Sequence, residues 1–143
     1  MYALSTCCFV KAELRRLDGF QSKCLRVILG ILPSYFSRVS NAAVREKAGW
    51  SSASEKLLQQ QMVLLGKVMR AEPASTLQEA CFIPGTLQPV TDQFVRKVGR
   101  PRKEWVTHVL PHAVHVAGGQ QQLRAAVQNA SHWKRLVKTP AIF

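Results

Sequence analysis

Apolar residues recur at steps of three and four along most of the chain, and glycine or proline ends most of these segments. Such spacing places apolar side chains on one face of an α-helix, whereas a half-buried strand needs alternation, which no run shows convincingly. The predicted helices cover residues 8–31, 41–47, 54–71, 75–81, 101–117, 120–128 and 131–138. The sequence therefore predicts an all-α fold, an irregular helical bundle of about five to seven helices.

The first predicted helix, residues 8–31, is amphipathic. Its apolar stripe, which we expect to pack in the core, consists of Leu14, Leu17, Phe20, Cys24, Ile28 and Leu29. Its polar face consists of Lys11, Arg15, Asp18, Ser22 and Arg26. Residues 34–40 are predicted to form a loop, after which Ser40 or Asn41 caps a short helix that ends at Gly49.

Glycines interrupt two of the predicted helices, Gly19 in 8–31 and Gly66 in 54–71. A glycine inside a helix costs about 1 kcal/mol relative to alanine. We therefore expect that cost at Gly66 unless close packing requires a residue without a side chain there.

Residues 82–100 are predicted to be a long connection, because two prolines and two glycines interrupt regular structure there. Connections of this length are usually functional or lie between domains. We therefore predict a boundary that separates a helical subdomain at 1–81 from a second one at 101–143.

Twenty lysine and arginine residues stand against eight acidic residues, which gives a formal net charge of +12. An excess this large predicts affinity for polyanions, and it favours nucleic acid over an anionic membrane surface. No segment is long and apolar enough to span a bilayer, and the N-terminus lacks the basic region of a signal peptide. If the protein is expressed, we expect a nuclear or cytoplasmic location.

The densest group of cations precedes the predicted helix 101–117. It consists of Arg96, Lys97, Arg100, Arg102 and Lys103. Pro101 suits the first turn of that helix, so the group lies on a loop that leads into a helix N-terminus, which favours anions. We predict phosphate contacts from these five residues, with Lys67 and Arg70 as weaker candidates. Two alternatives stay open. Gly99-Arg100-Pro101 is similar to the core of an AT-hook, a short arm that enters the minor groove of A·T-rich DNA. The basic group could instead be a solvated turn that precedes an ordinary helix.

Catalytic motifs are absent from the sequence. Two-metal phosphoryl transfer needs clustered acidic ligands, but Asp18 and Asp92 are the only aspartates and the glutamates are scattered. The chain has no glycine-rich phosphate loop and no G-x-S-x-G elbow. We therefore predict that it is not an enzyme and binds no cofactor.

Histidines and cysteines are the remaining candidates for metal binding. His108, His112 and His115 would share one face of an uninterrupted helix and could bind zinc or copper, but Pro111 lies among them. We favour a polar helix face over a metal site. The cysteines have no C-x-x-C spacing, so we expect reduced and mostly buried thiols at Cys7, Cys8, Cys24 and Cys81.

Six short motifs follow one another along the chain. They are Arg15–Gln21 (RRLDGFQ), Cys24–Ile31, Ser40–Val44, Leu65–Arg70, Gly99–Trp105 and Trp133–Val137. Their succession resembles the region that follows the palm in reverse transcriptases of LINE-type (non-LTR) retrotransposons, and it covers the chain from about Tyr2 to Val137. Many relatives have Gly-His where this chain has Gly66-Lys67, so any role of that histidine is not carried over.

The resemblance implies a thumb-like helical subdomain at 1–81, a basic linker at 82–100 and a C-terminal helical subdomain at 101–143. The family's enzymes are RNA-directed DNA polymerases. Their catalytic centre is built on an Asp-Asp turn in the palm, upstream of this region. We therefore expect a truncated copy of a transposable element, or a fragment of a gene model, that lacks the catalytic palm. It would contact template RNA, DNA or a hybrid duplex through phosphates. The alternative is a helical packing remnant without a ligand, whose apolar faces docked on the missing palm.

Overall fold

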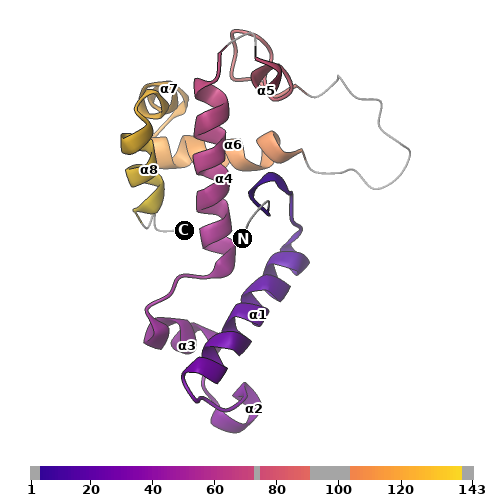
Figure 1. Ribbon diagram of the computed structural model, residues 1–143, viewed down its shortest axis with the longest axis vertical. Helices are drawn as coiled ribbons and strands as arrows, with labels where there is room; N and C mark the ends of the chain where they lie inside the picture. The colour runs from indigo at the N-terminus through magenta and orange to yellow at the C-terminus, as the bar shows by residue number, and fades with distance from the viewer. Residues whose placement is uncertain (1–3, 73–74, 91–103, 140–143) are drawn as a thin grey trace, which may run out of the picture. The chain divides into compact units, whose positions relative to one another are not determined.

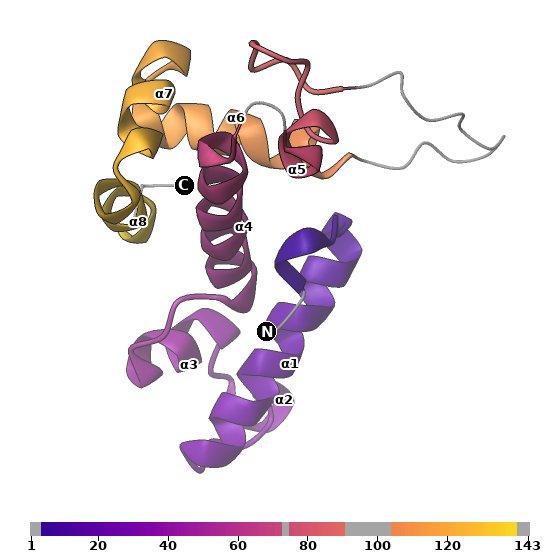
Figure 2. The same ribbon diagram turned by 45° about the horizontal axis from the view of Figure 1, so that its top comes forward.

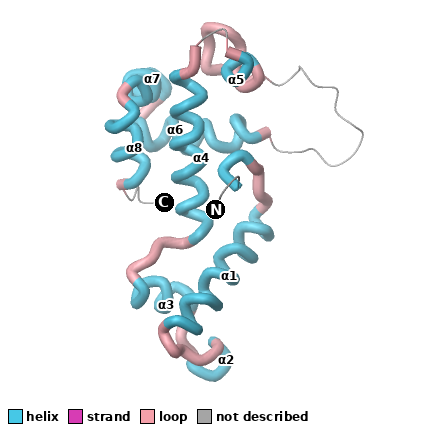
Figure 3. The backbone as a smooth tube through the Cα atoms, viewed as in Figure 1, coloured by secondary structure: helices cyan, strands magenta, loops and turns pink. Residues whose placement is uncertain are grey.

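A computed structural model describes residues 4–72, 75–90 and 104–139. Regular structure in these ranges is helical (Figure 3). There is also one isolated antiparallel bridge between Phe82 and Pro89. The elements are a 3-10 helix η1 (Leu4–Thr6) and the α-helices α1 (Lys11–Ile28), α2 (Ser34–Ser37), α3 (Asn41–Ala48), α4 (Ala53–Arg70), α5 (Thr76–Glu79), α6 (Trp105–Ala117), α7 (Gln120–Gln128) and α8 (Ala130–Lys138). The all-α prediction is confirmed. The described ranges hold eight α-helices, one more than the upper expectation, because residues 34–37 form a helical turn where a loop was predicted.

Internal contacts divide the chain into two compact units. Among the described residues, unit 1 comprises 9–58, and unit 2 comprises residues 4–8 together with those from Gln59 onward. This division falls within α4, whereas the sequence-based boundary lies at 82–100. Residues 91–103 of the predicted linker lie outside the described residues, and the linker stays a prediction.

Unit 1 is built on α1 and α3, which pack side by side (Figures 1 and 2). Ser40 caps α3, because its hydroxyl oxygen accepts a hydrogen bond from the Ala43 backbone N–H at 3.1 Å. At the other end Gly49 takes a left-handed conformation with φ of 65°. The Gly49 N–H donates to the Glu46 carbonyl and the Trp50 N–H to the Arg45 carbonyl, the paired bonds of a Schellman ending. Both predicted ends of this helix are therefore confirmed.

Side chains of α1 satisfy the start of α4. Asp18 accepts from the Ser54 N–H at 2.9 Å and from the Ser54 hydroxyl at 2.8 Å, and Gln21 accepts from the Ala53 N–H at 2.8 Å. Ser52 and Glu55 add a reciprocal capping box, with both bonds at 3.2 Å. The first N–H groups of a helix have no partner within it, and their partial positive charge stabilises a carboxylate such as Asp18. The Arg15–Gln21 motif thus contributes the groups that join α1 to α4 within unit 1.

The prediction that the apolar stripe of α1 packs in the core is wrong for its C-terminal half. Phe20 is 66 % and Ile28 77 % exposed, and Cys24 is exposed as well. The buried residues of α1 are instead Ser22, Leu25 and Arg26. The polar face turns inward because its side chains bond a helix start and loop carbonyls, groups that would otherwise be buried without partners.

Arg26 is the clearest case of this inversion, since only 7 % of the residue is exposed. Its guanidinium donates to the Leu32 carbonyl at 3.0 Å, the Ser37 hydroxyl at 3.3 Å, the Val39 carbonyl at 2.6 Å and the Asn41 side-chain oxygen at 3.1 Å. None of these four acceptors is a carboxylate. The planar fork of arginine is suited to bridging several fixed oxygens, and here it ties the end of α1 to the segment 32–41.

Unit 2 is organised around the indole of Trp133 on α8, which is fully buried against α4. Its Nε1–H donates to the Met62 carbonyl at 2.9 Å, and a Cβ placed at Gly66 would overlap the ring. The absence of a side chain at Gly66 therefore lets the indole lie against the α4 backbone, which explains a glycine in mid-helix. Helices α6, α7 and α8 pack on one another and complete the core with Val109, Leu123 and Val137.

Candidate nucleic-acid interface

The predicted phosphate contacts fall in two groups. Arg96, Lys97, Arg100, Arg102 and Lys103 lie outside the described residues. Lys67 and Arg70 lie in the last turn of α4, where Lys67 is exposed and Arg70 is half-buried. The Arg70 guanidinium donates to the Val127 carbonyl at 2.8 Å, near the end of α7. Part of its donor capacity is thus used to join α4 and α7, while the ammonium of Lys67 faces solvent.

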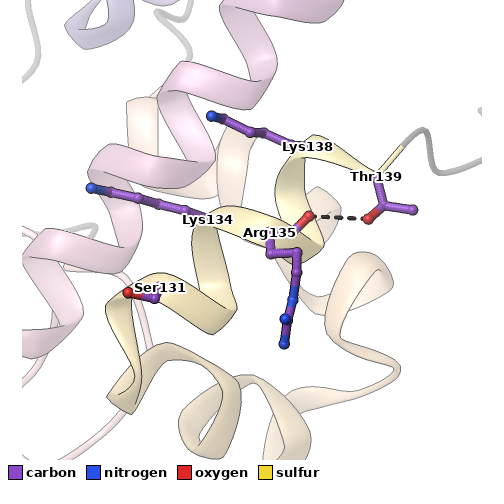
Figure 4. A pocket seen from close by; sticks show the side chains of 5 residues that line it. All are labelled: Ser131, Lys134, Arg135, Lys138 and Thr139. Atoms are coloured by element: carbon purple, nitrogen blue, oxygen red, sulfur yellow. Dashed lines mark hydrogen bonds between the residues drawn. The ribbon is translucent and has the colours of Figure 1, made fainter.

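Cations that were not among the predicted contacts line an open depression on α8 with a volume of about 570 Å³ (Figure 4). Its lining residues are Ser131, Lys134, Arg135, Lys138 and Thr139. Lys134 and Lys138 extend in the same direction from the helix, whereas Arg135 extends in another (Figure 4). The Thr139 hydroxyl donates to the Arg135 carbonyl at 3.0 Å. The depression therefore combines three cations with a serine hydroxyl, a set that suits an anion with several oxygens.

Local sequence explains why these side chains gather on α8. Asn129 caps the helix, because its side-chain oxygen accepts hydrogen bonds of 3.0 Å from the backbone N–H groups of Ser131 and His132. Trp133 and Val137 point into the core, and Lys134, Arg135 and Lys138 are left exposed on the other side of the helix. Cations near the C-terminus of a helix also oppose its dipole, and the basic residues of 134–138 fit that local role. Their spacing on the face opposite the buried tryptophan was the available signal for a shared surface.

Two of the three histidines of α6, His108 and His112, are in contact. The His108 and His112 rings meet edge to face with centroids 5.7 Å apart, and α6 continues through Pro111. In the ranges that the structure describes, no group of three or more histidine, cysteine or acidic side chains is arranged to hold a metal ion. The arrangement therefore gives no support to the metal-site alternative.

All four cysteines are reduced thiols, as predicted. The expectation that they are mostly buried is wrong, because Cys7 and Cys24 are exposed and Cys8 and Cys81 are half-buried. Burial raises the pKa of the Cys81 thiol by desolvating its thiolate form, which keeps this group protonated.

None of the helices in the described ranges has the length and apolar character required to cross a bilayer. The chain matches no protein-family model, and it has no significant match among curated proteins or solved structures. Fold and charge together define an all-α, strongly basic protein. The reverse-transcriptase resemblance thus rests on the sequence motifs alone.

Proposed function

We propose that the chain is a non-catalytic helical fragment of a non-LTR retrotransposon reverse transcriptase that binds nucleic acid by its sugar–phosphate backbone. The observation that carries the binding role is the depression on α8, where three cations line one surface of a chain with a net charge of +12. Lys67 and the cations of 96–103 would extend the contact. A protein that binds the sugar–phosphate backbone needs positively charged side chains, and it does not need to contact the edges of the bases.

Each phosphate contact releases counterions, so its loss has a defined effect on the salt dependence of binding. Replacing Lys134, Arg135 and Lys138 together with glutamine is expected to flatten the slope of log K against log salt by about 2–3 on duplex DNA. Fluorescence anisotropy on duplex DNA and on an RNA–DNA hybrid, across salt concentrations, measures this slope. A second variant that neutralises Arg96, Lys97, Arg100, Arg102 and Lys103 tests the predicted loop in the same assay.

The matched control removes the same charge from α1, with glutamine at Lys11, Arg15 and Arg16, which are exposed. We expect this control to change the slope less than the α8 variant. Equal slopes for the two variants would show that bulk charge alone attracts the nucleic acid, and binding that ignores salt would contradict the proposal altogether.

A specific observation favours a second candidate, a docking module without a nucleic-acid ligand. Unit 1 exposes large apolar side chains on α1, on α2 and between them. They are Phe20 (66 %), Val27 (82 %), Ile28 (77 %), Leu32 (64 %), Tyr35 (72 %) and Phe36 (66 %). Exposed apolar surface of this extent often marks a contact with another protein. The reverse-transcriptase palm is the partner that the resemblance implies.

A hydrophobic dye tests this second candidate. Wild-type chain is expected to bind 8-anilinonaphthalene-1-sulfonate while keeping a sharp near-ultraviolet circular dichroism signal, and lysine at Val27 and Ile28 should lower the dye fluorescence several-fold. Lysine at the exposed Ala12 is the control for added charge on α1. Because exposed substitutions change stability by about 0.5 kcal/mol or less, unfolding would not explain a difference. Dye binding that is unchanged in the Val27 and Ile28 variant would rule this surface out.

A further inference from the structure

Trp50 is the tryptophan that the fold leaves accessible, with 54 % of the residue exposed. Trp133 is fully buried, and Trp105 is half-buried with its Nε1–H bonded to the Ser5 carbonyl at 2.7 Å. These three are the only tryptophans of the sequence, and all lie in the described ranges. Trp50 therefore offers a large flat aromatic surface that the core of unit 1 does not require.

The backbone of Trp50 is anchored, and its ring contacts a cation. Its backbone N–H completes the ending of α3 through the bond of 3.0 Å to the Arg45 carbonyl. The Nζ atom of Lys56 lies 3.9 Å from the ring centroid, which places a cation over one face. The anchored backbone and the cation on one ring face restrict the positions open to the indole, which lowers the entropy cost when a planar ligand stacks on it.

The surroundings of Trp50 carry positive charge. In unit 1, nine lysine and arginine residues stand against four acidic residues over 9–58, and 9 − 4 gives +5. Three of the four carboxylates accept hydrogen bonds at helix starts: Glu13 from the Val10 N–H, Asp18 from Ser54 and Glu55 from the Ser52 N–H. Glu46 shares the last turns of α3 with Arg45 and Lys47, and Lys47 is exposed beside Trp50 in sequence.

We infer that Trp50 is a stacking site for an unpaired base of single-stranded nucleic acid, an inference that rests on the proposed function. Sequence-tolerant binding of single strands combines cations along the backbone with aromatic rings on which bases stack. Trp50 with Lys47 and Lys56 provides both elements within a few residues. In a duplex the bases already stack on one another, so this site discriminates in favour of single strands.

The test titrates the intact chain with oligothymidylate, with an abasic oligonucleotide of the same length and with a duplex. Oligothymidylate is expected to quench tryptophan fluorescence, because Trp50 is the exposed indole, whereas the abasic strand should bind without this quenching. Leucine at Trp50 should weaken oligothymidylate binding by about 5- to 150-fold and leave abasic binding unchanged. Phenylalanine at Trp50 should retain part of the affinity, since an aromatic ring remains.

The outcomes separate this inference from the proposed function. If duplex and abasic strands bind with salt-dependent affinity but Trp50→Leu changes nothing, the stacking site is refuted and phosphate binding stands. If Trp50→Leu weakens oligothymidylate and abasic strands equally, Trp50 acts through the fold or the backbone contacts, and the inference is overturned. If no polynucleotide binds at all, both fail.

Discussion

Replacing Trp133 with alanine is expected to lower the free energy of unfolding by about 3–5 kcal/mol. The indole is fully buried, and its Nε1–H bonds the Met62 carbonyl on α4. Its removal leaves a cavity between α8 and α4 and takes away the largest buried side chain. Urea unfolding followed by far-ultraviolet circular dichroism measures the change, with an unaltered slope required for the comparison.

The same contact can be probed from α4. Gly66→Ala places a methyl group where the indole lies, so we expect a loss of about 1–3 kcal/mol despite the better helix propensity of alanine. Gly19→Ala is the matched control, since no heavy atom lies within 4 Å of a Cβ at this other mid-helix glycine. That variant should gain about 0.5–1 kcal/mol. Equal stability of the two alanine variants would contradict the close packing of Trp133 on Gly66.

Replacing Arg26 with methionine is expected to cost about 3 kcal/mol of stability, the second large effect. Methionine fills the space of the aliphatic stem but leaves four oxygens of the segment 32–41 without their donor. Lysine at this position should recover only a small part, because a single ammonium group cannot reach acceptors that the guanidinium fork spans. Urea unfolding followed by far-ultraviolet circular dichroism measures the change in the free energy of unfolding.

Arg16→Met serves as the control for Arg26→Met. Arg16 lies on the same helix and is exposed, so its loss should change stability by about 0.5 kcal/mol or less. If the two variants unfold at the same urea concentration, Arg26 does not organise the segment that follows α1.

Local signals in the sequence determined where most helices begin and end. Ser40 supplies a hydroxyl cap, Gly49 permits the left-handed ending of α3, and Gly118 ends α6 in the same conformation. These features depend on backbone sterics and on bonds between residues a few positions apart. For that reason the all-α class, the positions of α7 and α8 and the end of α6 followed from the sequence. The predicted start of α6 at residue 101 is wrong, since the helix begins at Trp105 with Glu104 as its N-cap. The helix that was not predicted, α2, is a single turn without an apolar repeat, so periodicity could not reveal it.

The orientation of α1 was decided only by the tertiary structure. Helical periodicity identifies two faces but assumes that the apolar one is buried. In unit 1 the start of α4 and the carbonyls of 32–41 need donors and acceptors, and Asp18, Gln21 and Arg26 provide them. The C-terminal part of the polar face is therefore turned inward at Ser22 and Arg26, and Phe20, Val27 and Ile28 are left exposed.

The candidate site divides in the same way between sequence and structure. The sequence determined that the chain is strongly basic, because charge is a property of composition, and it offered Lys67 and Arg70 as weaker candidates for phosphate contact. Only the tertiary structure showed that Arg70 bonds Val127, that burial of Trp133 leaves the α8 cations on a common surface, and that Trp50 stays exposed under Lys56. These assignments depend on which neighbour each side chain meets across the fold, and contacts between residues distant in the chain leave no periodic trace in its sequence.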